Sequence, residues 1–168
     1  MPELPEVQTI VDDLNRKIKG LTIADVWTDW PKYFKRSPGG FKEFKKNVKN
    51  EKIRNVWRLG KNIIFDLSGD KKMLIHQKMT GHLLIGHWQI KSSRPMVTEK
   101  GPLAEKVNNY IHAIFWLSRK PFLPTPSKQP LQLRRLGAKA MEGTMMGFSD
   151  LRKFGKILMV DEKDFDNL

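Results

Sequence analysis

The chain opens with a short run of residues that could act as a nucleophile and its acids, Met1-Pro2-Glu3-Leu4-Pro5-Glu6. Initiator methionine is readily removed before a small residue, and its removal would leave Pro2 as a secondary amine. An α-amino group has a pKa of roughly 7.7–8.0, against about 10.4 for lysine, so part of it is neutral near pH 7. Such an amine can attack an electrophilic sugar carbon and form an iminium.

Two carboxylates accompany this amine. Glu3 lies beside it and could donate a proton, and Glu6 lies one helical turn further on. A purely structural interpretation stays open, because proline and glutamate are also common at the start of a helix.

The elements that must position these residues are one long helix, one short helix and many strands. Apolar residues at helical spacing predict a helix over 5–18, with Gly20 at its C-terminal cap. Phe41, Phe44 and Val48 indicate a shorter helix after the turn signal at 37–40. Strands are predicted over 21–27, 53–59, 62–67, 73–79, 83–90, 110–117 and 155–160. Turns eight to twelve residues apart favour an antiparallel sandwich over βαβ units.

Length and composition limit the remaining possibilities. With 168 residues and 39% hydrophobic content, the chain fits one globular domain. The absence of cysteine excludes disulfides, thiol nucleophiles and cysteine zinc sites in this chain. His76, His82 and His87 lack tight metal-ligand spacing, so we expect no metal site. No long apolar run or secretory signal is visible, so we expect no membrane association and a cytoplasmic location.

The net charge of +13 favours polyanionic partners, with nucleic acid first and an anionic membrane surface second. Residues 31–49 carry seven basic side chains against one acid, Glu43, although such a run is also compatible with a solvated helix face. Residues 119–143 contain four prolines and six basic residues, which indicates a functional or a disordered loop.

Four separated segments, read together, carry a family resemblance. The N-terminal run Pro2-Glu3-Leu4-Pro5-Glu6-Val7 resembles the signature of the formamidopyrimidine-DNA glycosylase family. The turn Gly60-Lys61 resembles that family's catalytic-lysine turn. Two further segments, at 76–81 and 149–155, resemble its DNA-probing loops. The resemblance implies a mainly β fold with some helix, an antiparallel β-sandwich flanked by the N-terminal helix and a second short helix.

The resemblance also implies catalytic roles. Pro2 would attack C1′ of the damaged nucleotide and form a Schiff base, and Glu3 would protonate the sugar ring oxygen or the departing base. Glu6 would support the site electrostatically, and Lys61 would bind phosphate near the lesion and assist the chemistry.

Further residues are implied to bind the DNA. Met79, Arg152 and Phe154 match the family residues that fill the space left by a flipped base, and a thioether and an aromatic ring suit a wedge. The alternative for Met79 and Phe154 is a place in the core, since both follow strand patterns. His112 and Lys153 would contact phosphates, although His112 could equally be an ordinary strand residue.

The chain departs from the family pattern in three respects. The resemblance implies that residues 1–168 correspond to the N-terminal catalytic domain alone, so we expect the helix–two-turn–helix and zinc-finger domain to be absent and no cofactor in this chain. Gln77-Lys78 replaces the commoner Leu-Gly, and Lys153 replaces an arginine. Residues 119–143 would be a basic, proline-rich insertion, either touching DNA as an arm or serving as a tolerated surface loop.

The expected function is that of a bifunctional DNA glycosylase and AP lyase of base excision repair. It would excise oxidised purines such as formamidopyrimidine and 8-oxoguanine, with activity reduced by the missing half. Its partner would be double-stranded DNA with an oxidised base or an abasic site, bound by a monomer. The alternative is a non-catalytic DNA-binding module of the same fold, and an unrelated RNA-associated sandwich rests on charge alone.

Overall fold

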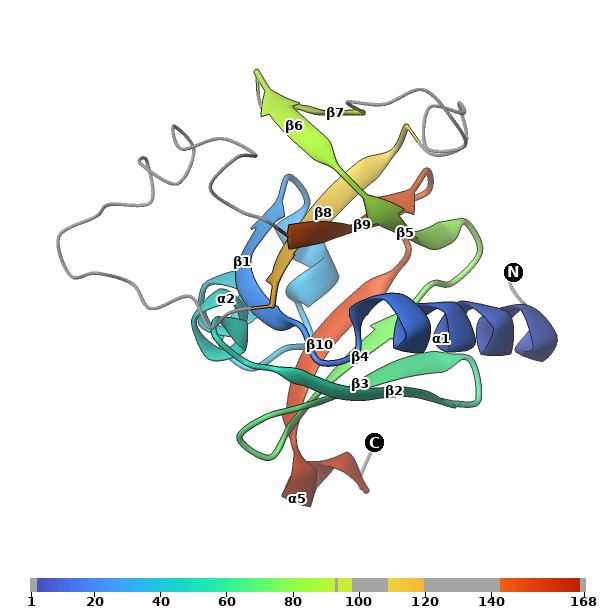
Figure 1. Cartoon of the computed structure of the whole chain (residues 1–168), viewed down its shortest axis with the longest axis vertical. Coiled ribbons are helices and arrows are strands. Elements are labelled where there is room, and N and C mark those ends of the chain that lie inside the picture. The colour runs from blue at the N-terminus through green and yellow to red at the C-terminus, as the bar shows by residue number, and fades with distance from the viewer. Residues whose placement is uncertain (1–2, 93, 98–108, 120–142, 167–168) are drawn as a thin grey trace, which may run out of the picture.

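Two antiparallel four-stranded sheets build the molecule (Figure 1). The computed structural model describes residues 3–92, 94–97, 109–119 and 143–166. The helical elements are α1 (Leu4–Ile18), the 3-10 helix η1 (Pro31–Phe34), α2 (Gly40–Val48) and α5 (Glu162–Phe165). One sheet has the order β1 (Thr22–Thr28), β8 (Ile111–Ser118), β9 (Gly143–Asp150), β5 (Gly81–Gly86). The other has the order β10 (Lys156–Asp161), β4 (Lys71–His76), β3 (Asn62–Leu67), β2 (Ile53–Leu59), and β6 (Trp88–Lys91) pairs with β7 (Arg94–Val97).

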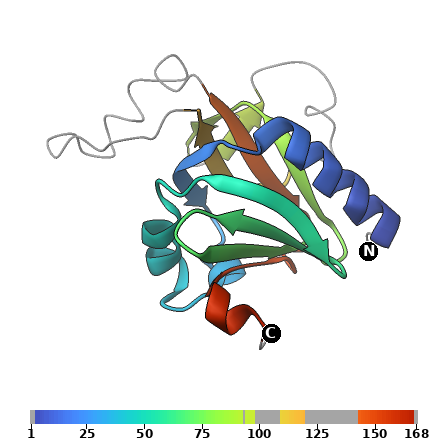
Figure 2. The same cartoon turned by 60° about the horizontal axis from the view of Figure 1, so that its bottom comes forward.

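The main core lies between the two sheets. Strand β3 supplies Ile63 and Phe65 to it, and the other sheet supplies Phe115 and Phe148. Because successive side chains of a strand point to opposite faces, Ile64 lies outside this core. It belongs to a second cluster with Leu74 and Leu158, against which Phe165 of α5 packs (Figure 2). Burial on both faces explains the nearly continuous apolar sequence of this strand.

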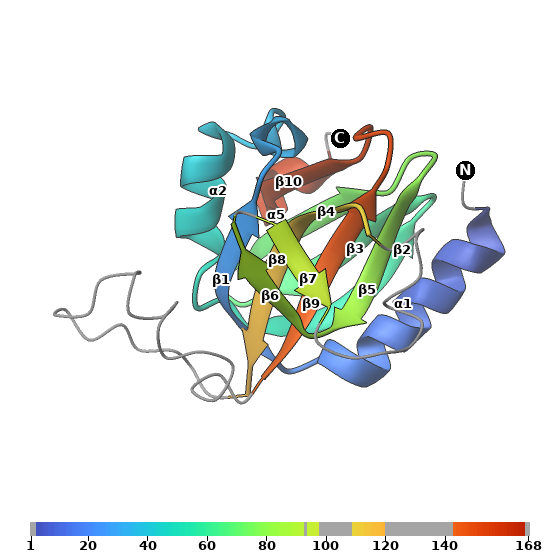
Figure 3. The same cartoon turned by 90° about the horizontal axis from the view of Figure 1, so that it is seen from above.

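The helices α1 and α2 lie on opposite sides of the sandwich (Figures 1 and 3). Helix α1 packs against β2, and α2 packs against β1 and β10. Two side chains fix α1 along β2. The Asn15 amide accepts from the Val56 N–H at 2.9 Å and donates to the Val56 carbonyl at 2.5 Å, and the Arg58 Nε donates to Gln8 Oε1 at 2.7 Å. The Asn15 bonds hold the second half of the helix on the middle of β2, and the Gln8 bond holds its second turn next to the end of β2.

The predicted antiparallel sandwich with a long and a short helix is confirmed, but several element ends differ. Strand β4 ends at His76 rather than at 79, because Lys78 adopts φ +56° and its N–H bonds the His76 side chain instead of a neighbouring strand. The single strand predicted at 83–90 is two strands in different sheets. Strands β7 and β9 and the short helices η1 and α5 were not predicted.

The predicted insertion at 119–143 falls largely on residues 120–142, outside the described residues. Ser118 and Gly143, which flank it, are register partners on β8 and β9, so the chain leaves and rejoins the sheet at adjacent positions. Within the part of the chain that the structure describes, no helix is long and apolar enough to cross a bilayer.

Replacing Asn15 by alanine should lower the free energy of unfolding by about 1–3 kcal/mol, because it leaves the Val56 amide and carbonyl without their partner. Urea unfolding followed by circular dichroism measures the loss. Asp13→Ala on the same helix is the matched control, since it removes only exposed ion pairs and should cost at most about 1 kcal/mol. Equal losses in the two variants would contradict the structural role of Asn15.

Candidate active site and nucleic-acid interface

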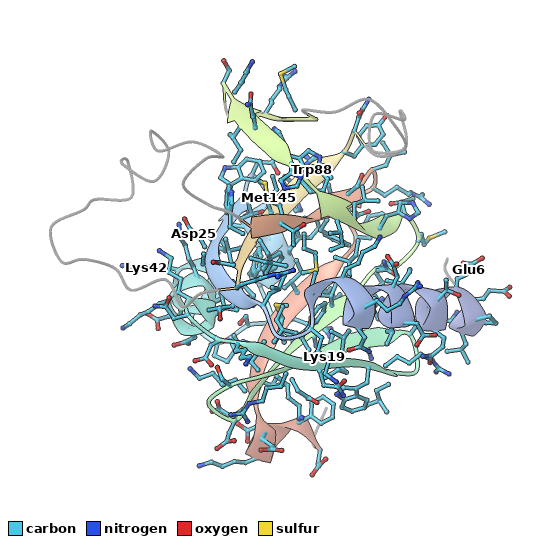
Figure 4. The ribbon with its side chains drawn as sticks, viewed as in Figure 1. Glu6, Lys19, Asp25, Lys42, Trp88 and Met145 are labelled. Carbon is cyan, nitrogen blue, oxygen red and sulfur yellow. The ribbon has the colours of Figure 1, made fainter. Side chains whose placement is uncertain are left out.

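Four segments that are far apart in sequence meet at one end of the sandwich. They are the start of α1, the β2–β3 turn, the β4–β5 loop and the β9–β10 loop, as Figures 1 and 3 show from two directions. Figure 4 shows Glu6 at the outer end of α1, pointing away from the core. The start of α1 and the two predicted DNA-probing loops therefore lie at the same end as the predicted catalytic turn of Lys61.

Glu3 and Glu6 make hydrogen bonds at the start of α1. The Glu3 N–H donates to Glu6 Oε2 at 3.2 Å, and the Val7 N–H donates to the Glu3 carbonyl at 3.0 Å. Pro2 lies outside the described residues. The Glu6 carboxylate thus folds back toward the beginning of the chain, at the positive end of the helix dipole, where a negative charge is stabilised. Glu6 therefore caps the helix, which is the structural role that the sequence left open as an alternative to catalysis. The same hydrogen bond places its carboxylate next to Glu3, the residue that follows Pro2.

A shallow hollow beside α1 is lined by Val7, Lys61, His76, Gln77 and Lys78. Lys61 reaches it from the tight turn between β2 and β3, where Gly60 has φ +60°, a conformation that glycine adopts at little cost. His76 is the register partner of Asn62, the residue after Lys61. The pairing of β3 with β4 therefore brings the predicted catalytic lysine to the residues that precede Met79.

The charges around this hollow are cationic and unpaired. Burial, and then the charges of Lys78, Lys156 and Lys61, hold the pKa of His76 below its usual range. The pKa of Lys156 is lowered as well, by desolvation and by Lys78 and Arg36. Among the described residues, none of these five basic side chains forms an ion pair with an acid. Concentrated positive charge without counter-charge is the arrangement that attracts phosphates.

Sequence analysis missed part of this cluster. It weighed the His76 side chain as a metal ligand, noted Lys78 as a departure from the family pattern within the 76–81 loop, and did not single out Lys156. Lys156 faces His76 across the β10–β4 pair, and only the strand register reveals that proximity. Gln77 was noted as a departure from the family pattern. Its side chain is 1% exposed, and its amide has no hydrogen-bond partner within the described ranges.

Met79, Arg152 and Phe154 lie together on two neighbouring loops. Met79 is 51% and Phe154 53% exposed, so neither belongs to the core. The Arg152 guanidinium lies between them: one terminal nitrogen is 3.6 Å from the Met79 sulfur, and its carbon lies 5.2 Å from the centre of the Phe154 ring. This arrangement matches the predicted one, in which two apolar side chains wedge between DNA bases and an arginine beside them makes a polar contact.

The other two predicted phosphate contacts have partners within the protein. His112 places Nδ1 2.9 Å from Asp29 Oδ1, and its side chain is only 14% exposed. Lys153 lies with Nζ 4.2 Å from the centre of the Trp30 ring, on which Lys32 also packs. His112 is thus held by a carboxylate, whereas the Lys153 ammonium lies over an aromatic face.

Within the described residues, no group of three or more histidine, aspartate or glutamate side chains is arranged to hold a metal ion. The expectation that this chain needs no cofactor stays a prediction.

Residues 1–157 match the family model described as the formamidopyrimidine-DNA glycosylase N-terminal domain. The chain belongs to the formamidopyrimidine-DNA glycosylase family. It is 31% identical over its full length to the formamidopyrimidine-DNA glycosylase of Pelotomaculum thermopropionicum, of which it covers 46%. It is 44% identical over 82 residues, 48% of this chain and 28% of the relative, to that of Mycoplasmopsis pulmonis.

Solved structures of formamidopyrimidine-DNA glycosylases share the fold. MutM in complex with DNA containing carbocyclic 8-oxo-G superimposes with a TM-score of 0.66 at 22% identity, covering 99% of this chain and 47% of that one. The Lactococcus lactis enzyme with DNA containing an abasic site gives the same score and identity, covering 99% and 46%. This chain therefore spans about half the length of these relatives.

The His76 ring should titrate with a pKa below 6.5, and Lys78→Gln should raise that pKa because it removes a neighbouring positive charge. Histidine signals followed by NMR against pH give both values. The unfolded chain binds more protons than the folded one between the depressed pKa and 6.5, so stability should fall as the pH is lowered through this window. Lys71→Gln, at the far end of the same strand, is the control. A His76 pKa that responds equally to both substitutions would contradict the arrangement.

Proposed function

We propose that this chain is the catalytic domain of a bifunctional DNA glycosylase and AP lyase of base excision repair. The observation that supports the proposal most strongly is the meeting of four segments at one end of the sandwich. The start of α1, the Lys61 turn, the hollow with His76 and the loops of Met79 and Arg152 lie in the family's order and at one surface. The proposed substrate is double-stranded DNA with an oxidised purine, such as formamidopyrimidine or 8-oxoguanine, or with an abasic site.

The proposed first step uses the secondary amine of Pro2 after removal of the initiator methionine. Its nitrogen lone pair forms a bond to C1′ as the bond between C1′ and the base breaks, and the base leaves with the electron pair. Glu3 supplies a proton to the departing base or to the ring oxygen. Opening of the sugar ring then gives an iminium between Pro2 and C1′. The Glu6 carboxylate, which points back toward this position, stabilises the positive charge.

The second step uses the iminium as an electron sink. It makes the C2′ proton acidic, so that loss of this proton expels the 3′-phosphate, and a further elimination expels the 5′-phosphate. Lys61 would hold a phosphate next to the lesion, and the neighbouring His76 and Lys78 belong to the same cationic hollow. A lysine on a tight turn provides a compact charge that stays in place during both eliminations.

Base extrusion precedes the chemistry, because an amine cannot reach C1′ while the damaged nucleotide is stacked. Met79 and Phe154 would fill the vacated space, and Arg152 would bond the orphaned partner base. Their exposure at neighbouring loop tips supports this assignment. Unstacking costs a few kcal/mol, which the inserted side chains would offset.

Borohydride should trap the chain covalently on duplex DNA that contains an abasic site, because it reduces the iminium to a stable amine. Pro2→Gly should give far less adduct, since it replaces the secondary amine. Denaturing gels with labelled DNA measure the yield. Intact mass analysis separates chains that retain Met1, in which Pro2 is an amide and adduct formation should be absent.

Two other results would change the assignment. DNA retention with no adduct from chains that have lost Met1 would instead support the non-catalytic binding module of the same fold. Absence of DNA binding would contradict both functions.

Lys156→Gln should weaken DNA binding and reduce the slope of log K against log salt by about one, as expected for the loss of one phosphate contact. We expect this because Lys156 lies near two other cations, Lys78 and Arg36, and forms no ion pair with an acid in the described part of the chain. Fluorescence anisotropy at several salt concentrations measures the slope. Lys71→Gln removes an equal charge that already pairs with Glu51 and should leave the slope unchanged. Identical slopes for the two variants would show that the effect is one of net charge alone.

A further inference from the structure

The carboxylate of Asp150 is buried and bonds both loops that carry the proposed wedge. The Asp150 side chain has 0% exposure. Its Oδ1 accepts from the Thr80 hydroxyl at 2.5 Å, and its Oδ2 accepts from the Gly155 N–H at 2.8 Å. The Thr80 oxygen in turn accepts from the Arg152 N–H at 3.1 Å. One carboxylate and one hydroxyl therefore join Met79's loop to the loop of Arg152 and Phe154.

Both loops also rest on the same aromatic ring. A Cβ atom placed on Gly81 or on Gly155 would lie less than 3 Å from the Phe148 ring, so each glycine lets its loop approach this ring closely. Behind the ring lies Tyr33, with ring centroids 5.3 Å apart in an edge-to-face arrangement. The loops therefore share a rigid support and cannot shift independently without breaking contacts with Phe148.

A buried carboxylate is costly unless donors compensate for its lost hydration. Here the Thr80 hydroxyl is the donor that comes from the other loop, so separating the loops would leave the buried Oδ1 of Asp150 without its donor, while the Gly155 N–H stays bonded to Oδ2. Surface ion pairs could hold two loops together at less cost, but they would not make separation so unfavourable. This arrangement penalises every state in which one loop moves alone.

We propose that Asp150, through Thr80, is a positioning residue that makes the two loops one unit, so that Met79 and Phe154 enter the DNA stack together. This inference rests on the proposed function, because it concerns how that function extrudes a base. Asp150 and Thr80 do not touch the DNA in this scheme. They act by holding the backbone from which Met79, Arg152 and Phe154 project.

The test measures insertion into DNA rather than stability. A duplex with a tetrahydrofuran abasic site and a neighbouring 2-aminopurine reports unstacking by its fluorescence, and anisotropy gives affinity for this duplex and for an undamaged one. The variants are Met79→Ala, Phe154→Ala and their combination, each in the wild-type background and with Thr80→Val. Thr80→Val breaks the bond between the loops and retains the bond from Gly155 to Asp150.

In the wild-type background we expect strong coupling: either alanine substitution removes most of the fluorescence change, and the double variant loses little more. Coupling here is the factor by which the effect of the double variant departs from the product of the two single effects. In the Thr80→Val background this factor should fall on the order of tenfold, so that Met79→Ala and Phe154→Ala act nearly independently. The affinity of Thr80→Val for the undamaged duplex should differ from that of the wild type by less than about twofold, or under about 0.5 kcal/mol. Asp150→Asn should reproduce the loss of coupling. Asp66→Asn, which removes a carboxylate bonded to Trp57 and Lys72, is the matched control.

Independent effects of the two alanine substitutions in the wild-type background would overturn the inference. Unchanged coupling in Thr80→Val would overturn it as well, and this variant carries the test if Asp150→Asn fails to fold. Wild-type chain that binds the abasic duplex but shows no coupling contradicts the inference alone. Wild-type chain that does not bind DNA contradicts the proposed function and, with it, the inference.

Discussion

The bonds of one buried carboxylate determine the shape of the end of the molecule that we assign to function. Asp150 closes the gap between two loops that are about seventy residues apart in sequence, and it does so with no exposed surface. Because these bonds compensate a charge inside the protein, they are hard to lose one at a time. They hold two large apolar side chains, Met79 and Phe154, in solvent, where the hydrophobic effect alone would not place them.

The positive charge of the chain is distributed unevenly between paired and unpaired side chains. On the flanks, Lys45 and Lys49 share Asp25, and Lys72 lies 2.6 Å from Asp66. At the proposed DNA-binding end, burial and then the charges of the surrounding lysines lower the pKa of His76, and these lysines repel one another. Such repulsion destabilises the free protein and is relieved when a phosphate binds, so the same side chains weaken folding and favour a polyanionic ligand. The unpartnered amide of Gln77 in this hollow adds a second local cost of the same kind.

Strand patterning explains which elements were predictable. The helix over 5–18 and the strands with regular apolar residues were found because each carries its own periodicity. Strand β9 was missed because Gly147 interrupts it, and glycine is unfavourable inside a strand. In the structure a Cβ at this position would crowd the Trp88 ring, so the glycine makes room for a tryptophan from β6, which lies beside Met145 (Figure 4). That reason exists only once the two segments are packed.

The sequence by itself determined the family, the sandwich and the types of residue available for chemistry, because motifs, turn signals and apolar periodicity are local properties of the chain. It pointed to Lys61, Met79, Arg152 and Phe154, and only the family resemblance implied that the last three act in one place. Only the tertiary structure decided that His76 and Lys156 face each other, that His112 is held by Asp29, and that Asp150 joins two loops. These are contacts between distant segments, and they depend on strand register and sheet packing, which a single sequence does not specify.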